Sequence, residues 1–170
     1  MQVYETERLR VRYLEDSDLP DLYAICSHPV VMKYMDAGKP LTEEQTALWI
    51  RKSRANYRDH GFGCMAVISK QNDAFIGFCG LVYAPGSPAV EIIYALVPPY
   101  WGRGLASEVA AGMIKFGFEQ CGLTEILATI EPQNTNSSKI AEKLGMTFLG
   151  ERPDEEGAPV RFYQIKRPAG

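Results

Sequence analysis

The sequence predicts an α/β (α+β) domain built on one mixed β-sheet, and three observations support this. A chain of 170 residues with a hydrophobic fraction of 46% is large and apolar enough for one substantial core. Short runs rich in Val, Ile, Phe and Tyr alternate with segments whose apolar residues recur every three or four positions. A strand–helix–strand unit over residues 90–130 requires a parallel strand pair. We expect a single domain over residues 1–170, with its core in residues 6–167.

The strands and helices follow from composition, periodicity and the positions of capping residues. The four expected helices begin after capping residues or a glycine turn, and three of them end at or just before a glycine. They span about residues 16–25, 42–60, 104–120 and 137–144. The expected strands are rich in β-branched and aromatic residues and are bounded by Gly, Pro, Asn or Asp. They span residues 7–14, 64–68, 75–83, 90–96, 125–130, 146–150 and 160–166.

Composition and charge exclude several classes of protein. No apolar run is long enough to cross a bilayer, and the N-terminus lacks a basic segment followed by an apolar one. The net charge of −3, without a long basic run, disfavours a nucleic-acid partner. The four cysteines contain no C-x-x-C pair, and the two histidines have no neighbours at metal-ligand spacing. We therefore expect a cytoplasmic protein with no metal site and no membrane partner.

The glycine turn at residues 101–107 lies where an expected strand is followed by a helix. Its sequence is W-G-R-G-L-A-S. Small residues allow backbone N–H groups to approach a ligand closely, and a helix N-terminus favours negative charge. The turn therefore suits a phosphate group. It does not contain the G-x-x-x-x-G-K-[ST] loop of nucleoside triphosphatases, and Ser107 stands where a dinucleotide-binding turn has its third glycine.

Residues 101–106 resemble the pyrophosphate-binding signature [QR]-x-x-G-x-[GA] of the GCN5-related N-acetyltransferase (GNAT) superfamily. Trp101 in the first place, within the form Y-W-G-x-G-x-A-x-E, is typical of the RimJ/RimL-like branch, whose members include ribosomal-protein N-terminal acetyltransferases. The resemblance covers nearly the whole chain. It includes the segments T-E-R-L at 6–9, G-F-C-G-L at 77–81, V-E-I-I-Y at 90–94, N-x-x-S at 134–137 and E-K-L-G-M at 142–146.

This resemblance implies a GNAT fold with a mixed central sheet of six to seven strands and about four flanking helices. The fourth and fifth strands, 90–96 and 125–130, are expected to be parallel and to splay apart. The implied reaction is direct transfer of acetyl from acetyl-coenzyme A to a primary amine in a ternary complex, by a monomer or homodimer. The acceptor is a protein N-terminus or a small molecule. The implied cofactor-binding residues are Leu96, Val97, Trp101, Gly102, Arg103, Gly104, Leu105, Ala106, Ser107, Asn134, Ser137 and Lys143.

The resemblance also assigns roles within the reaction. A backbone N–H near Leu96 or Val97 would stabilise the thioester oxygen as it gains charge, Asn134 would contact the pantetheine arm, and Ser137 would lie near the thiol. The alternative for Asn134 and Ser137 is helix capping, and for Arg103 a solvated turn. Many relatives place a tyrosine acid seven residues after the asparagine, where this chain has Ala141.

Glu91 is the first candidate for the general base. It lies in an apolar strand and shares a face with Ile93 and Ala95, so its pKa could be raised. Glu131 is the second candidate for the base. The alternative for Glu91 is an exposed strand residue with no catalytic role. We expect acceptor selectivity to lie in residues 16–60 and 153–160. A non-catalytic acyl-coenzyme A sensor is the alternative function.

Overall fold

The structure is a computed structural model that describes residues 1–35 and 38–169. Its strands form one mixed sheet in the order β1-β2-β3-β4-β5-β6-β8-β7, in which β5 and β6 are parallel neighbours. The helices are α1 (Leu19–Cys26), α2 (Glu43–His60), α3 (Leu105–Glu119) and α4 (Thr135–Lys143). The strands are β1 (Gln2–Glu5), β2 (Leu9–Tyr13), β3 (Cys64–Ser69), β4 (Phe75–Tyr83), β5 (Val90–Leu96), β6 (Glu125–Ile130), β7 (Thr147–Pro153) and β8 (Pro159–Lys166).

The mixed α/β fold, the four helices and the parallel pair confirm the prediction, and the sheet has one strand more than expected. The extra strand, β1, pairs antiparallel with β2 through a bulge between Gln2 and Tyr4. Four residues with a single apolar alternation are too short to give a clear strand pattern, so the sequence did not reveal it. The fourth helix begins at Thr135, earlier than expected, because Asn134 is its N-cap.

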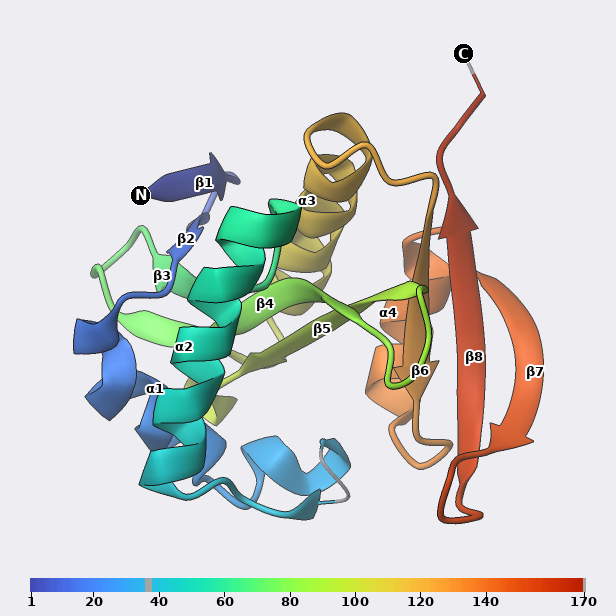
Figure 1. Ribbon diagram of the computed structural model, residues 1–170, viewed down its shortest axis with the longest axis horizontal. Helices are drawn as coiled ribbons and strands as arrows, with labels where there is room; N and C mark the ends of the chain where they lie inside the picture. Colours follow the sequence, from blue (N-terminus) through green and yellow to red (C-terminus); the bar gives the residue numbers. More distant parts are fainter. Residues whose placement is uncertain (36–37, 170) are drawn as a thin grey trace.

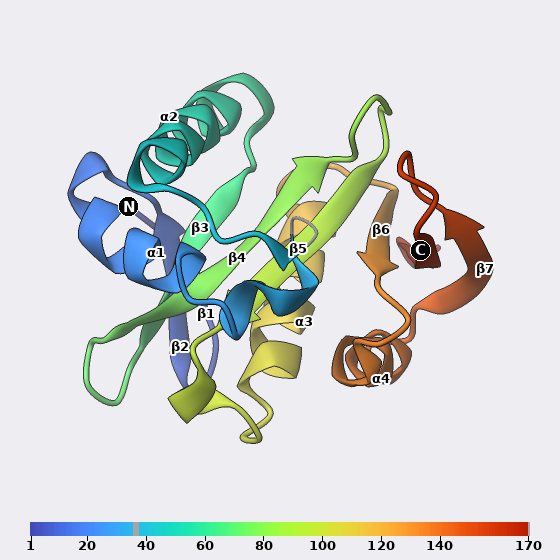
Figure 2. The same cartoon turned by 90° about the horizontal axis from the view of Figure 1, so that it is seen from below.

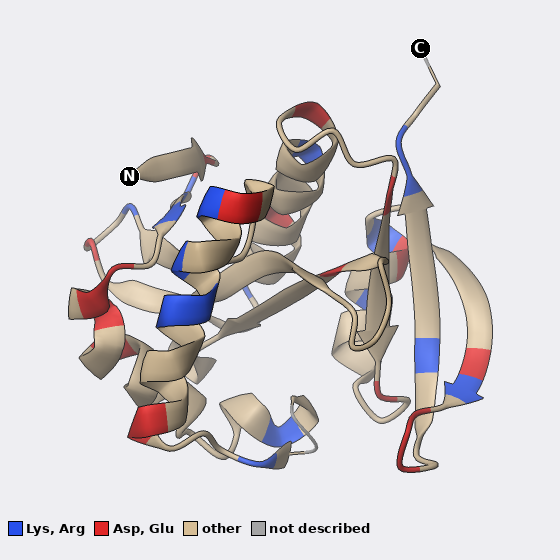
Figure 3. Cartoon of the chain, in the orientation of Figure 1, with Lys and Arg blue, Asp and Glu red and all other residues tan. Residues whose placement is uncertain are grey.

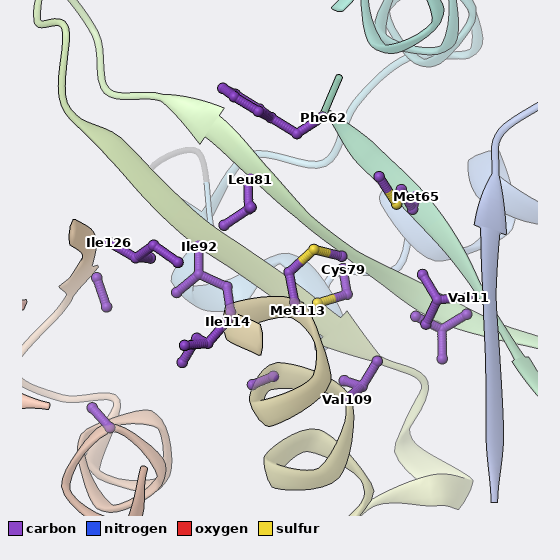
Figure 4. Packing of buried hydrophobic residues seen from close by; sticks show 14 of the residues in the cluster. Val11, Phe62, Met65, Cys79, Leu81, Ile92, Val109, Met113, Ile114 and Ile126 are labelled. Atoms are coloured by element: carbon purple, nitrogen blue, oxygen red, sulfur yellow. The ribbon is translucent and has the colours of Figure 1, made fainter. Parts of the chain in front are cut away.

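Helices cover both faces of the sheet (Figure 1). One core lies between the sheet and α3, where Val109, Ala110 and Met113 are fully buried. Figure 4 shows Met113 and Ile114 of α3 close to Ile92 of β5. A second core lies between α1, α2 and the opposite face of β3 and β4. Full burial of each large apolar side chain contributes roughly 1.5–3 kcal/mol, so these two cores hold the helices to the sheet.

Strand β5 contributes alternate side chains to the two cores. Val90, Ile92 and Leu96 belong to the core beneath α3, whereas Ile93 and Ala95 pack against the core formed with α1 and α2. This alternation is the period-2 pattern of a strand covered on both faces. It determines which β5 side chains face α3 and α4 and which face α1 and α2.

Strands β5 and β6 pair at one position only, Glu91 with Leu127, and then diverge. Figure 2 shows the two strands close together near their N-terminal ends and separated at their C-terminal ends. Prolines follow both strands, at residues 98, 99 and 132. Because proline lacks an N–H group, it cannot continue a ladder. The predicted splay of the parallel strands is therefore confirmed.

Basic residues recur along α2, where they are exposed (Figure 3). They are Arg51, Lys52, Arg54 and Arg58. Arg54 forms an ion pair of 2.7 Å with Asp16.

Among the described residues, no helix is long and apolar enough to cross a membrane.

We expect Gly77→Ala to lower the free energy of unfolding by about 3 kcal/mol. A Cβ at residue 77 would lie 2.1 Å from the Ala95 carbonyl oxygen and 2.7 Å from a Leu96 methyl group, so β5 would have to move away from β4. Urea denaturation measures the change. Lys166→Ala, at the exposed end of β8, is the control and should change stability by less than about 0.5 kcal/mol. Equal midpoints for Gly77→Ala and the wild type would contradict the close approach.

Candidate functional site

A cavity of about 460 Å³ lies beside the open end of β5. Its walls come from β5, the turn before α3, the first turns of α4, and the segment between α1 and α2. Five residues expected at the cofactor site line it, namely Leu96, Trp101, Ala106, Asn134 and Ser137. The remaining lining residues are Val30, Val31, Lys33, Tyr34, Met35, Tyr94, Ala95, Asn136 and Ile140.

The turn before α3 presents a series of free backbone donors. Within residues 1–35 and 38–169, the N–H groups of residues 102–107 have no hydrogen-bond acceptor, and the first satisfied amide is that of Glu108, 3.1 Å from the Gly104 carbonyl oxygen. Gly102 and Gly104 have φ angles of 74° and 75°, which glycine adopts without strain. No atom lies within 4 Å of where a Cβ of Gly102 would be. Donors at a helix N-terminus with open space before them fit a pyrophosphate.

Glu108 holds this turn against the N-terminal segment of the chain. Its carboxylate accepts hydrogen bonds from the Thr6 hydroxyl, from the Arg8 backbone N–H at 3.0 Å and from the Arg8 guanidinium at 2.8 Å. The same guanidinium donates to the Arg103 carbonyl oxygen at 2.9 Å. Partial burial opposes ionisation of Glu108, but the Thr6 and Arg8 hydrogen bonds outweigh it and keep the pKa below its ordinary value. We call these three residues the Thr6–Arg8–Glu108 clamp.

The indole of Trp101 fixes the end of β5. Its Nε1 donates to the Leu96 carbonyl oxygen at 2.6 Å, and the ring is about half exposed. The Val97 amide donates to the Ile76 carbonyl oxygen of β4 at 2.9 Å. Because hydrogen-bonding direction alternates along an antiparallel pair, the Leu96 N–H faces away from β4 toward the splayed side. The structure therefore leaves the Leu96 amide facing the slit and uses the Val97 amide within the sheet.

Asn134 and Ser137 take part in helix capping and also line the cavity, although the sequence analysis treated capping and ligand contact as alternatives. The Asn134 side-chain oxygen accepts the Ser137 backbone N–H at 3.2 Å, which is N-cap geometry. Both residues also line the cavity. Lys143 is exposed at the last turn of α4 and does not line the cavity. The Arg103 guanidinium lies over the Tyr100 ring, 5.5 Å from its centre.

Glu91 lies at the closed end of the slit, where β5 and β6 still pair. Ala95 lies four positions further along β5, roughly 13 Å away in a strand, and Glu91 does not line the cavity. Burial raises its pKa, and a hydrogen bond of 3.1 Å from the Thr129 hydroxyl partly offsets that effect. Glu131 follows β6, half-buried, and its backbone oxygen accepts the Asn134 amide at 2.9 Å.

Sequence reasoning did not single out Tyr94 or the individual residues between α1 and α2. Tyr94 alternates with apolar strand residues, so its pattern is that of a core side chain. Residues 30–35 include the 3₁₀ turn η2 (Val31–Tyr34), which has no strong periodicity. Their contribution agrees with the broad expectation for residues 16–60, although Asp36 and Ala37 lie outside the described residues. The 153–160 turn contributes nothing to the cavity. No cluster of three metal-ligating side chains occurs in the described part of the chain.

Comparisons with known proteins identify relatives along most of the chain. The family described as "Acetyltransferase (GNAT) domain" matches residues 8–147. The N-acetyltransferase p20 of Bacillus licheniformis is 32% identical over 166 residues, covering 97% of this chain and 93% of that protein. A GNAT-family acetyltransferase structure from Bacillus anthracis aligns with a TM-score of 0.81 at 29% identity, covering 98% of each chain. RimL, a ribosomal L7/L12 alpha-N-protein acetyltransferase in complex with coenzyme A, aligns at 0.84 with 15% identity and 98% coverage of each chain, and shows the fold alone.

We expect Glu108→Gln to weaken coenzyme A binding about tenfold, because the substitution removes the charged acceptor that holds the turn. Isothermal titration calorimetry with coenzyme A measures the affinity. Glu119→Gln, at the exposed end of the same helix, should bind as the wild type does. Wild-type affinity in Glu108→Gln would show that the turn does not depend on the Thr6–Arg8–Glu108 clamp.

Proposed function

This chain belongs to the GNAT acetyltransferase family, whose members use acetyl-coenzyme A, and from that premise we propose that it acetylates a primary amine by direct attack in a ternary complex. The acceptor we propose is a protein N-terminus or a small-molecule amine, with the enzyme in the RimJ/RimL-like branch and in the cytoplasm. The match to acetyltransferases argues against the alternative of a non-catalytic sensor.

One observation carries the proposal: the free donors of residues 102–107 stand at one end of an open strand edge that borders a cavity. Acetyl-coenzyme A supplies an activated acetyl group on a long arm with a pyrophosphate. The turn fits the pyrophosphate, and the unpaired edge of β5 fits an extended arm that forms strand-like hydrogen bonds. Asn134 on α4 would contact the arm from the other side of the slit.

We place the oxyanion donor at the Leu96 amide rather than at Val97. Negative charge develops on the thioester oxygen during attack, and a preorganised N–H pointing at that oxygen stabilises the transition state. The Val97 amide already has the Ile76 carbonyl oxygen as its partner. Trp101 holds the Leu96 carbonyl oxygen, which keeps the neighbouring peptide groups in place.

Glu91 is our proposed general base, and because it does not line the cavity it would accept the amine proton through a chain of water molecules along the slit. Its raised pKa makes the carboxylate a better proton acceptor than an exposed glutamate. The Thr129 hydroxyl orients it from β6. Glu131, closer to the open end of β6, remains the second candidate.

The acceptor and the activity can be tested together. The protein is incubated with acetyl-coenzyme A and a panel of polyamines, amino acids, aminoglycosides and peptides with free N-termini. Thiol release and product mass are then measured. We expect one class of amine to gain a single acetyl group at a rate well above the hydrolysis of acetyl-coenzyme A. Saturable binding of acetyl-coenzyme A without acetylation of any amine would support the sensor instead.

A pH profile tests the base. Glu91 must be ionised to accept a proton, so kcat/KM should fall as the pH drops through its raised pKa, above the range of an exposed glutamate. Glu91→Gln should lower kcat/KM at neutral pH about 100-fold and remove that acidic limb. Glu131→Gln should keep the limb. If Glu131→Gln loses the limb and Glu91→Gln keeps it, the base is Glu131.

A further inference from the structure

The leaving sulfur has no donor where the resemblance expects one. Position 141 is a fully buried alanine in the core beneath α4, so it offers no hydroxyl. Ser137, one turn earlier on α4, lines the cavity. Two tyrosines, Tyr34 and Tyr94, also line this cavity and carry hydroxyl groups.

Tyr94 carries its hydroxyl on the β5 side of this cavity, whereas Tyr34 belongs to η2, between α1 and α2. Tyr94 lies on β5 two residues before Leu96 and on the same face of the strand, toward α3 and α4. Its side chain lines the cavity together with Ser137 and Ile140 of α4. Tyr94 of β5 and Ser137 of α4 therefore border the same cavity from two different elements.

The geometry points to Tyr94 as the hydrogen-bond donor to the sulfur of coenzyme A, a catalytic role that rests on the proposed acetyl transfer. The acetyl carbonyl, with its oxygen at the Leu96 amide, is bonded directly to this sulfur. The sulfur therefore lies in the same cavity, between β5 and α4. Tyr94 on β5 and Ser137 on α4 both line this cavity, so the Tyr94 side chain borders the space that the sulfur would occupy.

The electron balance of the step defines what Tyr94 does. The amine nitrogen forms a bond to the acetyl carbon, the carbon–sulfur bond breaks, and its electron pair remains on sulfur. The amine proton passes to the base. Tyr94 donates its O–H to the developing thiolate and retains the proton.

Acidity explains why the proton stays on Tyr94. Burial raises the pKa of its phenol to about 12, with the Ser137 contact as a partial offset. An alkyl thiol such as that of cysteine has a pKa of about 8.5. The phenol is therefore the weaker acid, and the bond stabilises the thiolate without full transfer.

The groups around Tyr94 contain little other charge. Cys79 of β4 is paired with Tyr94 in the sheet, and burial keeps its thiol protonated by raising its pKa. Ser137 faces it from α4, and Lys33 is the only charged residue that lines the cavity in the described part of the chain. An effect of Tyr94 on the sulfur should therefore be separable from other titrations.

The test uses coenzyme A with its free thiol and needs no acceptor. The pKa of the bound thiol is measured from thiolate absorbance as pH is raised, in the wild type, in Tyr94→Phe and in Tyr83→Phe. Tyr83 is half-exposed at the end of β4 and does not line the cavity, so it is the matched control. We expect the bound thiol to have a pKa at least one unit higher in Tyr94→Phe than in the other two proteins. Calorimetry verifies that all three bind coenzyme A.

The turnover measurements add a readout that a purely structural role would not change. With acetyl-coenzyme A, kcat of Tyr94→Phe should fall about 10- to 100-fold, with KM nearly unchanged. With an acetyl thioester of a more acidic thiol, the loss should shrink because the leaving group needs less stabilisation.

Equal thiol pKa values in Tyr94→Phe and the wild type, with coenzyme A bound to both, would overturn the role of Tyr94. Failure of the wild type itself to bind coenzyme A would instead overturn the proposed function. If Tyr94→Phe does not fold, 3-fluorotyrosine at position 94 keeps the size and makes the phenol more acidic. It should then lower the pKa of the bound thiol, and an unchanged value would count against the proposal.

Discussion

The parting of β5 and β6 after one residue pair is the constraint on which the site depends. A continuous parallel ladder would satisfy the Leu96 amide within the sheet and fill the cavity with strand. Instead, the prolines that follow both strands end the pairing. The backbone groups left unpaired lie beside the cavity, where a bound ligand can form hydrogen bonds with them. The two cores on either side of β4 and β5 keep the opening from closing.

The sequence predicted most of the fold because its strands and helices have regular patterns of burial. Seven of the eight strands in the described residues were expected, and β1 was too short to be recognised. At the site, the turn at 101–107 was predictable because glycine spacing is local. The Thr6–Arg8–Glu108 clamp was not, since its members are about a hundred residues apart and only the fold brings them together.

The same distinction between local and distant information applies to the chemistry. The resemblance left the oxyanion donor at either Leu96 or Val97, because the sequence does not show which of the two amides pairs with β4. That depended on the register of Gly77 with Leu96. The sequence did not identify Tyr94 because an aromatic residue in an apolar strand indicates packing, and only its place in the cavity wall distinguishes it from a core residue.

The Thr6–Arg8–Glu108 clamp makes the beginning of the chain a structural part of a site formed by residues near its middle. Loss of the first eight residues would remove the Thr6 and Arg8 contacts to Glu108, together with β1 and the Tyr4 hydroxyl that donates to the Val109 carbonyl oxygen of α3. The N-terminal residues thus support both the packing of α3 and the position of the turn before it. Residues 167–169 project away from the domain in Figure 1, far from this turn.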